Sequence, residues 1–465
     1  MMNQAPRTRH TDGKQATADS GRTAPGAVVA VKRVFAAETG SFFLLLGTTV
    51  FLVVFGLIMV LSSSSVESMS QNGSFLTAFL RQGTYALLGI PMMLVASRMP
   101  ISFWKRWAWP AILLGCVLQL LVFVPGLGYG YGGNQNWIKI GGFTAQPSEL
   151  VKLALVVWLA WIVTAKKDLL NDWKHVALPI APVAGVAIGF VLLGNDLGTA
   201  VIMLSVVLGA LFYAGVRLRI IGTAIVVIGA IGVGFASLSD SRTARIEAWM
   251  SGCSEKSDFS SYCWQTVHGW WALADGGILG SGLGGSRAKW NWLPEADNDF
   301  IFAIIGDELG LIGSLVVLIL FVVLAFAFVR IMRTATDPFA KVATGAVMIW
   351  IIGQAFVNIA VVLGVLPVLG VPLPLISAGG SAMIASLLAI GVVLSFARVR
   401  PELAAAEAQN ATEATVTSSV RRTRQATRGE ARRRRVRDEP PVTAVPLTPQ
   451  ERSRAAAAAR AESRR

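Results

Sequence analysis

The sequence predicts an all-α polytopic membrane protein with about ten transmembrane helices and a large external loop between the seventh and the eighth. Composition gives the first reason: 54% of the 465 residues are hydrophobic, 15% are charged, and the mean hydropathy is +0.59. The second reason is that apolar runs close to the roughly 20 residues needed to cross a bilayer recur along the chain. Two or three soluble domains would fit the length but not these observations.

Ten such runs follow one another and are predicted to form one membrane domain over residues 39–400. They cover residues 41–61, 79–97, 107–125, 149–165, 176–193, 197–216, 219–238, 300–330, 342–366 and 379–397. No small-residue cleavage site follows the first run, and a polar tail precedes it. We therefore expect no removable signal peptide.

Basic residues gather in alternate loops, which orients the spans. Cytoplasmic loops carry an excess of Lys and Arg, so both termini are predicted to be cytoplasmic. This orientation requires an even number of spans, in agreement with the ten runs. The residues concerned are Lys32, Arg33, Arg98, Lys105, Arg106, Lys166, Lys167, Lys174, Arg217, Arg219, Arg330, Arg333, Lys341, Arg398 and Arg400.

Two tails, residues 1–38 and 401–465, are predicted to be disordered in the cytoplasm, and with the loops they account for the formal charge of +14. The second tail has no apolar periodicity and cannot bury enough apolar surface to fold alone. Its run Arg432–Arg435 could bind anionic lipid or an acidic cytoplasmic protein. A solvated basic tail is the alternative, and nucleic acid has no aromatic or fold support.

Three cysteines occur, two of them in the long external loop at 239–299. Cys116 lies in the third run, where packing is the expected role. Cys253 and Cys263 lie in a compartment that permits oxidation, so a disulfide is favoured over two free thiols. A metal site is not favoured, because His268 is the only histidine nearby.

The first external segment, residues 126–149, is rich in glycine and contains Trp137, so it is predicted to be a loop lying on the membrane. It leads into Glu149 and Lys152, which share one helix face just inside the membrane. A structural salt bridge and a charged cavity are both open interpretations of this pair. Asp196, in a later short loop, adds an acidic residue at the same face.

The long external loop contains a Gly-rich stretch, residues 275–286, which ends at Ser286 and precedes Arg287 and Lys289. Closely spaced glycines let backbone N–H groups approach an anion, and two cations could hold a phosphate. Because the stretch faces outward beside a membrane, a lipid-linked phosphate is the expected ligand. A flexible loop or close helix packing is the alternative.

An acidic cluster, Glu295, Asp297 and Asp299, stands directly before the apolar run that begins at Phe300. Ionisable groups at a membrane boundary are costly and indicate a functional site; a solvated acidic loop end is the alternative. The last external turn, residues 364–381, is rich in proline, which is tolerated at membrane depth where backbone lines a cavity. An ordinary reentrant linker would have the same composition.

Residues 40–400 resemble the SEDS family, the shape, elongation, division and sporulation proteins. The resemblance rests on WIKIGGFTAQPSELVK, NDLGTA, GSGLGGSRAKWNWLPEADNDFIFAIIGDELG and LPVLGVPLPLISAGGS, in this order. It implies a glycosyltransferase that polymerises lipid II, the undecaprenyl-pyrophosphoryl disaccharide-pentapeptide, at the outer leaflet. The division branch fits better than the elongation branch, partly because both tails are long.

The resemblance also implies residue roles. Asp299 matches the family's essential acidic residue. Glu149 and Lys152 match the family's conserved pair in the fourth span, and Asp196 matches the Asp of its short fifth loop. Relatives often have His-Thr before that acid, whereas this chain has Asp297 and Asn298. Either Asp297 or Asp299 could therefore titrate as the base.

In the expected reaction, one of these side chains accepts a proton and others stabilise the leaving group. Asp299 would take the proton of a sugar hydroxyl as general base, with its pKa raised by Glu295, Asp297 and desolvation. Lys289, Arg287 and Lys152 would stabilise the departing pyrophosphate. A divalent cation, Mg²⁺ or Mn²⁺, could share that role, although no metal motif is visible. One displacement would invert the anomeric carbon.

Partners and location follow from the resemblance. It implies a class B penicillin-binding protein transpeptidase and other division membrane proteins as partners, at the septum of the inner (plasma) membrane. Two other functions stay open. A lipid II flippase or transporter should place its charges along a path through the membrane, whereas these cluster outside. A non-catalytic division scaffold would not need Asp299.

Overall fold

The computed structural model describes residues 39–72, 74–131, 134–141, 143–236, 240–253, 263–290, 292–398 and 448–462. The chain divides into two units, residues 1–399 and 400–465, and each is described by itself. The predicted N-terminal tail, residues 1–38, and the run Arg432–Arg435 lie outside the described residues.

In the described part of the first unit, ten apolar helices occupy the ten predicted spans, which confirms the predicted fold class. Seven are long and apolar enough to cross a membrane: α2 (Gly40–Asn72), α3 (Thr77–Ala96), α4 (Ile101–Leu120), α5 (Pro147–Ala165), α6 (Trp173–Leu193), α11 (Ile301–Thr334) and α12 (Pro338–Val362). The three shorter ones are α7 (Leu197–Tyr213), α8 (Leu218–Ala236) and α13 (Gly380–Phe396). Two 3-10 turns, η1 (Leu121–Phe123) and η2 (Lys167–Leu169), follow α4 and α5.

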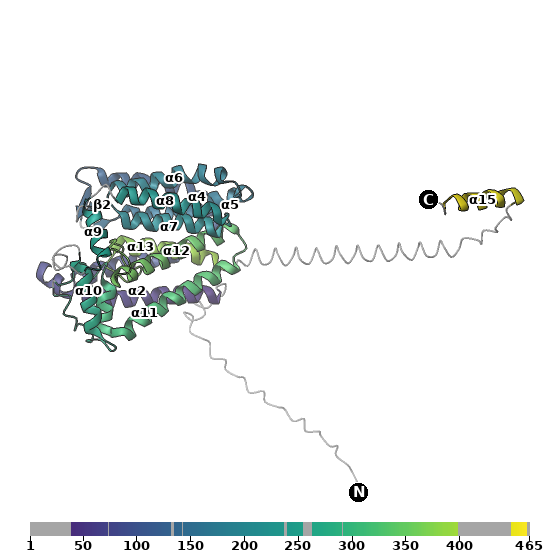
Figure 1. Ribbon diagram of the computed structural model, residues 1–465. Helices are drawn as coiled ribbons and strands as arrows, with labels where there is room; N and C mark the ends of the chain where they lie inside the picture. Colours follow the sequence, from purple (N-terminus) through teal and green to yellow (C-terminus); the bar gives the residue numbers. More distant parts are fainter. Residues whose placement is uncertain are drawn as a thin grey trace, which may run out of the picture. The chain divides into compact units, whose positions relative to one another are not determined.

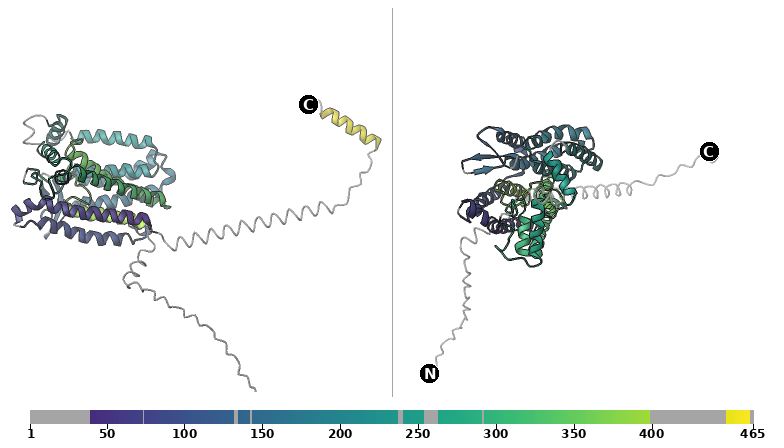
Figure 2. Two further views of the ribbon diagram at one scale, coloured as in Figure 1. Left: turned by 90° about the horizontal axis from the view of Figure 1, so that it is seen from below. Right: turned by 60° about the vertical axis from the view of Figure 1, so that its left-hand side comes forward.

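The helices run side by side in one bundle (Figures 1 and 2). Of the seven crossing helices, α5 and α12 are the most enclosed, with 72% and 67% of their most apolar window buried. α12 packs along α7 and α5, α13 along α3, and α11 along α2. Small residues permit the close approaches: a Cβ on Gly209 of α7 would lie 2.7 Å from the Ile349 side chain of α12. Four of the residues described below, Glu149, Lys152, Gln354 and Asn358, lie on these two enclosed helices.

The chain enters and leaves the bundle at the same end. Thr39 Oγ1 donates a hydrogen bond to Ala397 O at 2.9 Å. Beside this contact, the Arg398 guanidinium lies 5.6 Å from the centroid of the Phe42 ring. Since the first helix starts where the last one finishes, the bundle is crossed an even number of times, as the charge pattern predicts.

The opposite end carries a three-stranded antiparallel sheet, together with α9 (Asp240–Met250) and α10 (Trp264–Gly276) (Figure 1). The strands are β1 (Gly128–Tyr131), β2 (Asn134–Ile140) and β3 (Phe143–Ala145), paired in the order β1-β2-β3. The prediction of a mere interfacial loop for residues 126–149 is therefore wrong. Two glycines, at 132 and 133, connect β1 to β2, and such a dipeptide between two runs is a hairpin signal.

The described residues of the second unit form one helix, α15 (Pro449–Glu462), so the predicted disorder does not extend over this segment. The Glu451 side chain caps its first turn. The Thr448 backbone N–H and hydroxyl donate to Glu451 Oε2 at 3.0 and 2.9 Å. Pro449 occupies the first helical position, and the alanines at 455–459 have the highest helix propensity. These local signals favour a helix at this segment.

Candidate active site

The main chain of Asp299 is held by α12. Asn358 Nδ2 donates to Asp299 O at 2.8 Å and also to Val371 O at 2.8 Å. The Asn358 side chain is buried, so these bonds are shielded from water. One amide thereby joins the acidic segment before α11 to the last external turn, and it fixes the distance between them.

The two residues before Asp299 are tied to the same turn. Ala378 N donates to Asp297 O at 2.9 Å, and Ser377 Oγ donates to Asn298 O at 2.7 Å. Three successive carbonyls are therefore bound by α12 or by residues 364–381. The proline-rich turn is irregular backbone folded against the acidic segment, which is the arrangement expected where such backbone lines a site.

Asp299 is half-buried, and one of its two carboxyl oxygens has no hydrogen-bond partner among the described residues. Among the described residues, its Oδ1 is buried and has no hydrogen-bond partner. A Cβ on Gly370, which has a φ of +67°, would lie 3.6 Å from its Oδ2. Burial, followed by the negative charges of Glu295, Asp196 and Asp297, raises the pKa of Asp299 to about 7. A carboxyl group with this pKa can act as a base near neutral pH.

Asp196 is brought into electrostatic reach of Asp299 but is itself fully engaged. It caps α7, because Oδ1 accepts from Thr199 N at 2.8 Å. Its Oδ2 accepts from Gln146 Nε2 at 2.9 Å. Burial raises the pKa of Asp196, against the lowering effect of the Thr199 bonds. We assign it the role of a fixed neighbour that adds negative potential, as both its oxygens are bound.

Glu149 Oε1 and Lys152 Nζ form a buried salt bridge of 2.8 Å on α5, in agreement with the first of the two interpretations left open. Among the described residues, Glu149 Oε2 is buried without a hydrogen-bond partner, so the charged cavity also stays an open interpretation. Lys152 is 1% exposed and lies 4.9 Å from the centroid of the Trp350 ring. Its ammonium group is neutralised by Glu149 and shielded by the bundle. The prediction that Lys152 holds the pyrophosphate is therefore not supported by this geometry.

Two amides of α12, which the sequence analysis missed, organise this region. Gln354 Oε1 accepts from Lys152 Nζ at 3.0 Å, and Gln354 Nε2 donates to Pro372 O at 2.9 Å. Asn358 follows four residues later on the same helix face, where it holds Asp299. The signal was present, because two polar side chains in an apolar span are costly unless they serve a site.

The Gly-rich stretch packs into a break in α11. This helix is interrupted at Gly310, whose φ of 67° and ψ of −166° are not helical. Gly282 N donates to Glu308 O at 2.9 Å across the break. A Cβ on Gly280 would lie 2.2 Å from the same carbonyl oxygen, so a larger residue does not fit. Close helix packing, one of the alternatives stated above, explains these glycines better than a phosphate cradle does.

Lys289 also forms a buried ion pair. Its Nζ lies 3.2 Å from Glu308 Oε1 and donates to Gly284 O at 2.7 Å. Ser62 of α2 donates to Glu308 Oε2 at 2.6 Å. The prediction that Lys289 binds pyrophosphate is not supported, because a carboxylate at the break in α11 neutralises it. The pair instead connects α2, the Gly-rich stretch and α11.

The remaining predicted residues of the loop differ in exposure. Arg287 is exposed, whereas Ser286 is buried beneath the loop. Of the three predicted cations, Arg287 is thus the one whose side chain is accessible. Glu295 is half-buried with a φ of +56°, and its Oε2 accepts from Asn298 Nδ2 at 3.3 Å. It is placed to act on Asp299 through its charge.

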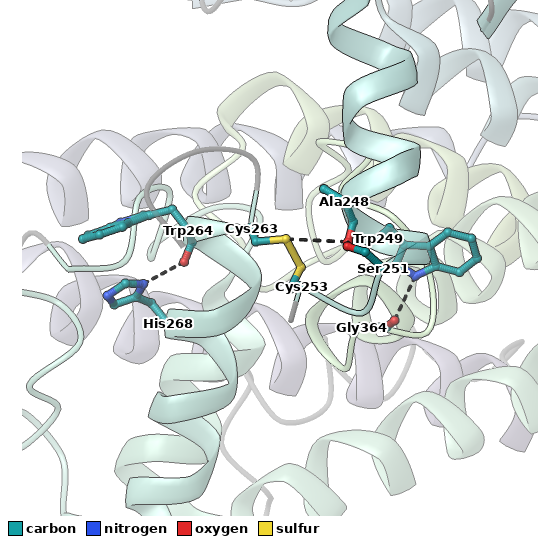
Figure 3. The surroundings of a disulfide bond; sticks show 8 residues. All are labelled: Ala248, Trp249, Ser251, Cys253, Cys263, Trp264, His268 and Gly364. Carbon is teal, nitrogen blue, oxygen red and sulfur yellow. Dashed lines mark hydrogen bonds between the residues drawn. A yellow bond between two sulfur atoms is a disulfide. The ribbon is translucent and has the colours of Figure 1, made fainter. Parts of the chain in front are cut away.

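Cys253 and Cys263, whose pairing the sequence favoured, are joined as a disulfide with an S–S distance of 2.00 Å. The bond links the end of α9 to the start of α10. Figure 3 shows it between the two helices, with the Trp249 indole directed towards Gly364 of the last external turn. The external loop is therefore connected to the turn that holds the acidic segment.

In the part of the chain that the structure describes, no three His, Cys, Asp or Glu side chains are grouped as ligands for a metal ion. The acidic residues near Asp299 act on it by charge instead, and Asp196 is already bound by donors from two other residues. The residues present thus do not fit a dedicated Mg²⁺ or Mn²⁺ site, and we derive no step through a metal.

A family model described as cell cycle protein, covering FtsW, RodA and SpoVE, matches residues 43–401. A protein of Mycobacterium tuberculosis named probable peptidoglycan glycosyltransferase FtsW is 40% identical over 366 residues, which are 79% of this chain and 69% of that protein. The protein of the same name in Geobacter sulfurreducens is 38% identical, over 74% of this chain and 91% of its own length. Stage V sporulation protein E of Bacillus subtilis is 34% identical, over 78% and 98%.

Two solved structures share the fold. One is a chain of a peptidoglycan synthase complex that coordinates polymerization and crosslinking, with a TM-score of 0.60 and 24% identity over 75% of this chain and 96% of that one. The other is the rod shape determining protein RodA of Thermus thermophilus, with a TM-score of 0.58 and 22% identity over 78% and 98%. At these identities the likeness concerns the arrangement of helices.

Proposed function

We propose, from the premise that this chain belongs to the FtsW, RodA and SpoVE family of cell cycle proteins, that it is a peptidoglycan glycosyltransferase of the cell membrane. The chain is a multi-pass membrane protein, and its relatives named as peptidoglycan glycosyltransferases cover most of the membrane domain. One observation carries the assignment of the site: Asp299 has a buried, unpartnered Oδ1 among the described residues and lies at the external end of the bundle.

The substrate we propose is lipid II, polymerised at the outer leaflet. A sugar hydroxyl of one molecule attacks the anomeric carbon of another. As the new C–O bond forms, the bond to the pyrophosphate oxygen breaks, and undecaprenyl pyrophosphate leaves with the electron pair. Asp299 accepts the hydroxyl proton. A single displacement of this kind inverts the anomeric configuration.

Arg287 is the cation that we assign to the departing pyrophosphate. Lys152 and Lys289 are neutralised by Glu149 and Glu308, whereas Arg287 is exposed next to the Gly-rich stretch. A guanidinium group matches two phosphate oxygens with paired N–H donors and keeps its charge at any relevant pH. This proposal replaces the expected set of three cations with one.

The proposed setting is the division septum, with both termini in the cytoplasm. The basic loops and the shared end of the first and last helices support this orientation. A class B penicillin-binding protein is the proposed external partner. Supporting it, one structural neighbour comes from a complex that coordinates polymerization with crosslinking. The Arg-rich tail is proposed to contact anionic lipid or an acidic protein on the cytoplasmic side.

The test uses the purified full-length chain in liposomes with lipid II as the substrate, and it measures glycan polymer directly. Wild-type protein is expected to make polymer, and Asp299→Asn is expected to make it about 1000-fold more slowly. Asp172→Asn is the matched control, because Asp172 is an exposed carboxylate at the start of α6. Polymer at wild-type rate from Asp299→Asn refutes the assignment of the base.

The same liposomes separate the alternative functions. Transfer of labelled lipid II between leaflets without polymer would indicate a flippase. Absence of both activities in folded wild-type protein, alone and with a class B penicillin-binding protein, would indicate a scaffold. Either outcome overturns the proposed function.

A further inference from the structure

We propose that the disulfide-linked hairpin of α9 and α10 is a positioning element of the active site, which acts by clamping the last external turn at Gly364. This inference rests on the proposed function, because the position it controls is that of Asp299. Trp249 of α9 and Trp270 of α10 make the contact. Both are positioning residues, since they act through the turn.

The contact encloses Gly364 from two sides. Trp249 Nε1 donates to Gly364 O at 3.0 Å (Figure 3). On the other side, a Cβ on Gly364 would lie 2.3 Å from the Trp270 ring, and the φ of +77° also requires glycine. The turn therefore begins in a slot formed by two indoles that belong to different helices.

The disulfide holds these two helices together. Cys253, Cys263, Ala248 and Val267 form a hydrophobic cluster of their own, separate from the main core. Four small side chains bury little apolar surface and so contribute little stability. The covalent bond is therefore the main link between α9 and α10, and it keeps Trp249 opposite Trp270.

The turn connects the clamped residue, Gly364, to the backbone beside the reactive carboxylate of Asp299. Six residues after Gly364, the backbone at Gly370 faces Asp299 Oδ2. The next carbonyl, that of Val371, shares the Asn358 amide with Asp299 O. The first end of the stretch 364–370 is held by the hairpin and also by the C-terminus of α12, where Gly364 N donates to Val361 O at 2.9 Å. Its other end is held by Asn358 of α12. Release of the hairpin contact removes one of the two anchors at the first end and so loosens the backbone that covers Asp299.

A loosened turn has a chemical consequence that loss of stability alone does not have. Water reaching Asp299 favours its charged form, so its pKa falls. The charged groups that act on Asp299 are Glu295 and Asp297 in its own segment and Asp196 at the start of α7. None of these belongs to the hairpin, so their effect persists when the clamp is removed.

The experiment compares wild type, Trp249→Phe and Cys253→Ser/Cys263→Ser. Trp249→Phe keeps an aromatic ring and removes the N–H donor. Trp271→Phe is the matched control, because Trp271 is an exposed indole on α10 that makes a T-shaped contact with the His268 ring. Hydrogen exchange of residues 364–371 and the polymerisation rate against pH are measured on the full chain.

We expect faster exchange in the turn for both test variants, and a kcat about threefold lower in Trp249→Phe with KM little changed. The acidic limb of kcat should move to lower pH. Trp271→Phe should match wild type in each measurement. Exchange and pH limb equal to wild type in Trp249→Phe overturn the proposal, even if the double cysteine variant fails to fold.

The outcomes separate this inference from the function it rests on. If wild type makes no polymer, either alone or with a class B penicillin-binding protein, the proposed function fails, and the exchange measurement still tests the clamp. If wild type is active and the turn exchanges equally in all variants, the clamp fails and the function stands.

Discussion

Ionisable side chains shielded from water, fully or in part, occur in two arrangements in this protein. In the helical bundle, Lys152 is paired with Glu149, and Lys289 is paired with Glu308. At the end of the bundle opposite Thr39 and Ala397, Asp299 is surrounded by like charges, and its Oδ1 has no hydrogen-bond partner among the described residues. A paired charge holds elements together, whereas an unpaired carboxyl group with a raised pKa is reactive. A charged residue at the membrane boundary could have either role. The presence or absence of an oppositely charged partner distinguishes the structural charge from the reactive one.

The largest effect should come from the unpaired carboxylate. Asp299→Asn keeps the shape and removes the base, so polymerisation should fall by about 1000-fold, within the range of general base catalysis. The apparent melting temperature should not fall, because the amide needs no desolvated charge. Polymer gels and a thermal unfolding scan check the two halves. If Asp299→Asn lowers both the melting temperature and the activity, Asp299 has a structural role like that of the paired charges.

The paired charges should behave in the opposite way. Glu308→Gln leaves the Lys289 ammonium buried and unpaired, which should cost about 3 kcal/mol of stability. Lys289→Met/Glu308→Gln should recover most of that loss, because no charge is then left alone. Asp337→Asn, at the partly exposed pair with Lys105, is the control and should cost less than about 1 kcal/mol. Equal losses in the single and double variants would contradict the comparison.

The pH profile should sharpen the comparison. Because Asp299 must be ionised to act and has a pKa of about 7, kcat should fall as the pH drops below about 7. Glu295 repels the ionised form and so raises this pKa. Glu295→Gln should therefore move the acidic limb to lower pH, and Asp297→Asn should move it less. Measurements of kcat from pH 5 to 9 test this prediction. If the acidic limb does not move in Glu295→Gln, a group other than Asp299 titrates there.

The smallest effect is expected at the exposed cation. Arg287→Ala should lower the polymerisation rate about tenfold, since one charge-assisted contact to the pyrophosphate is lost. Arg287→Lys should keep part of the rate, because the charge remains while the paired donors are lost. Initial rates at saturating lipid II test this. If both variants equal wild type, Arg287 is a surface charge with no role in the departure of the leaving group.

The spans and the acidic segment could be predicted from sequence because each rests on local pattern. Apolar length marks a span, and the charges of Glu295, Asp297 and Asp299 stand out beside the apolar run from Phe300. The hairpin of β1 and β2 also had a local signal, the two glycines between the strands. It was missed because the segment was interpreted as an interfacial loop of a membrane protein.

The roles of individual cations could not be predicted, because each depends on contacts between distant residues. Nothing near Lys289 in the sequence indicates that Glu308 and Ser62 will enclose it. The Gly-rich stretch has the same composition whether it cradles a phosphate or fills the break at Gly310. Tertiary packing alone separates these cases.

The hydrogen bonds that fix the acidic segment also set an order for biosynthesis. Asp299 is synthesised well before Asn358, Ser377 and Ala378, which hold its segment. Chains are made from the N-terminus and their parts assemble as they emerge. A nascent chain that has inserted α11 therefore has its acid but not the scaffold that positions it. The site matures only when the last two helices join the bundle, so truncated products are expected to be inactive wherever they end before this turn.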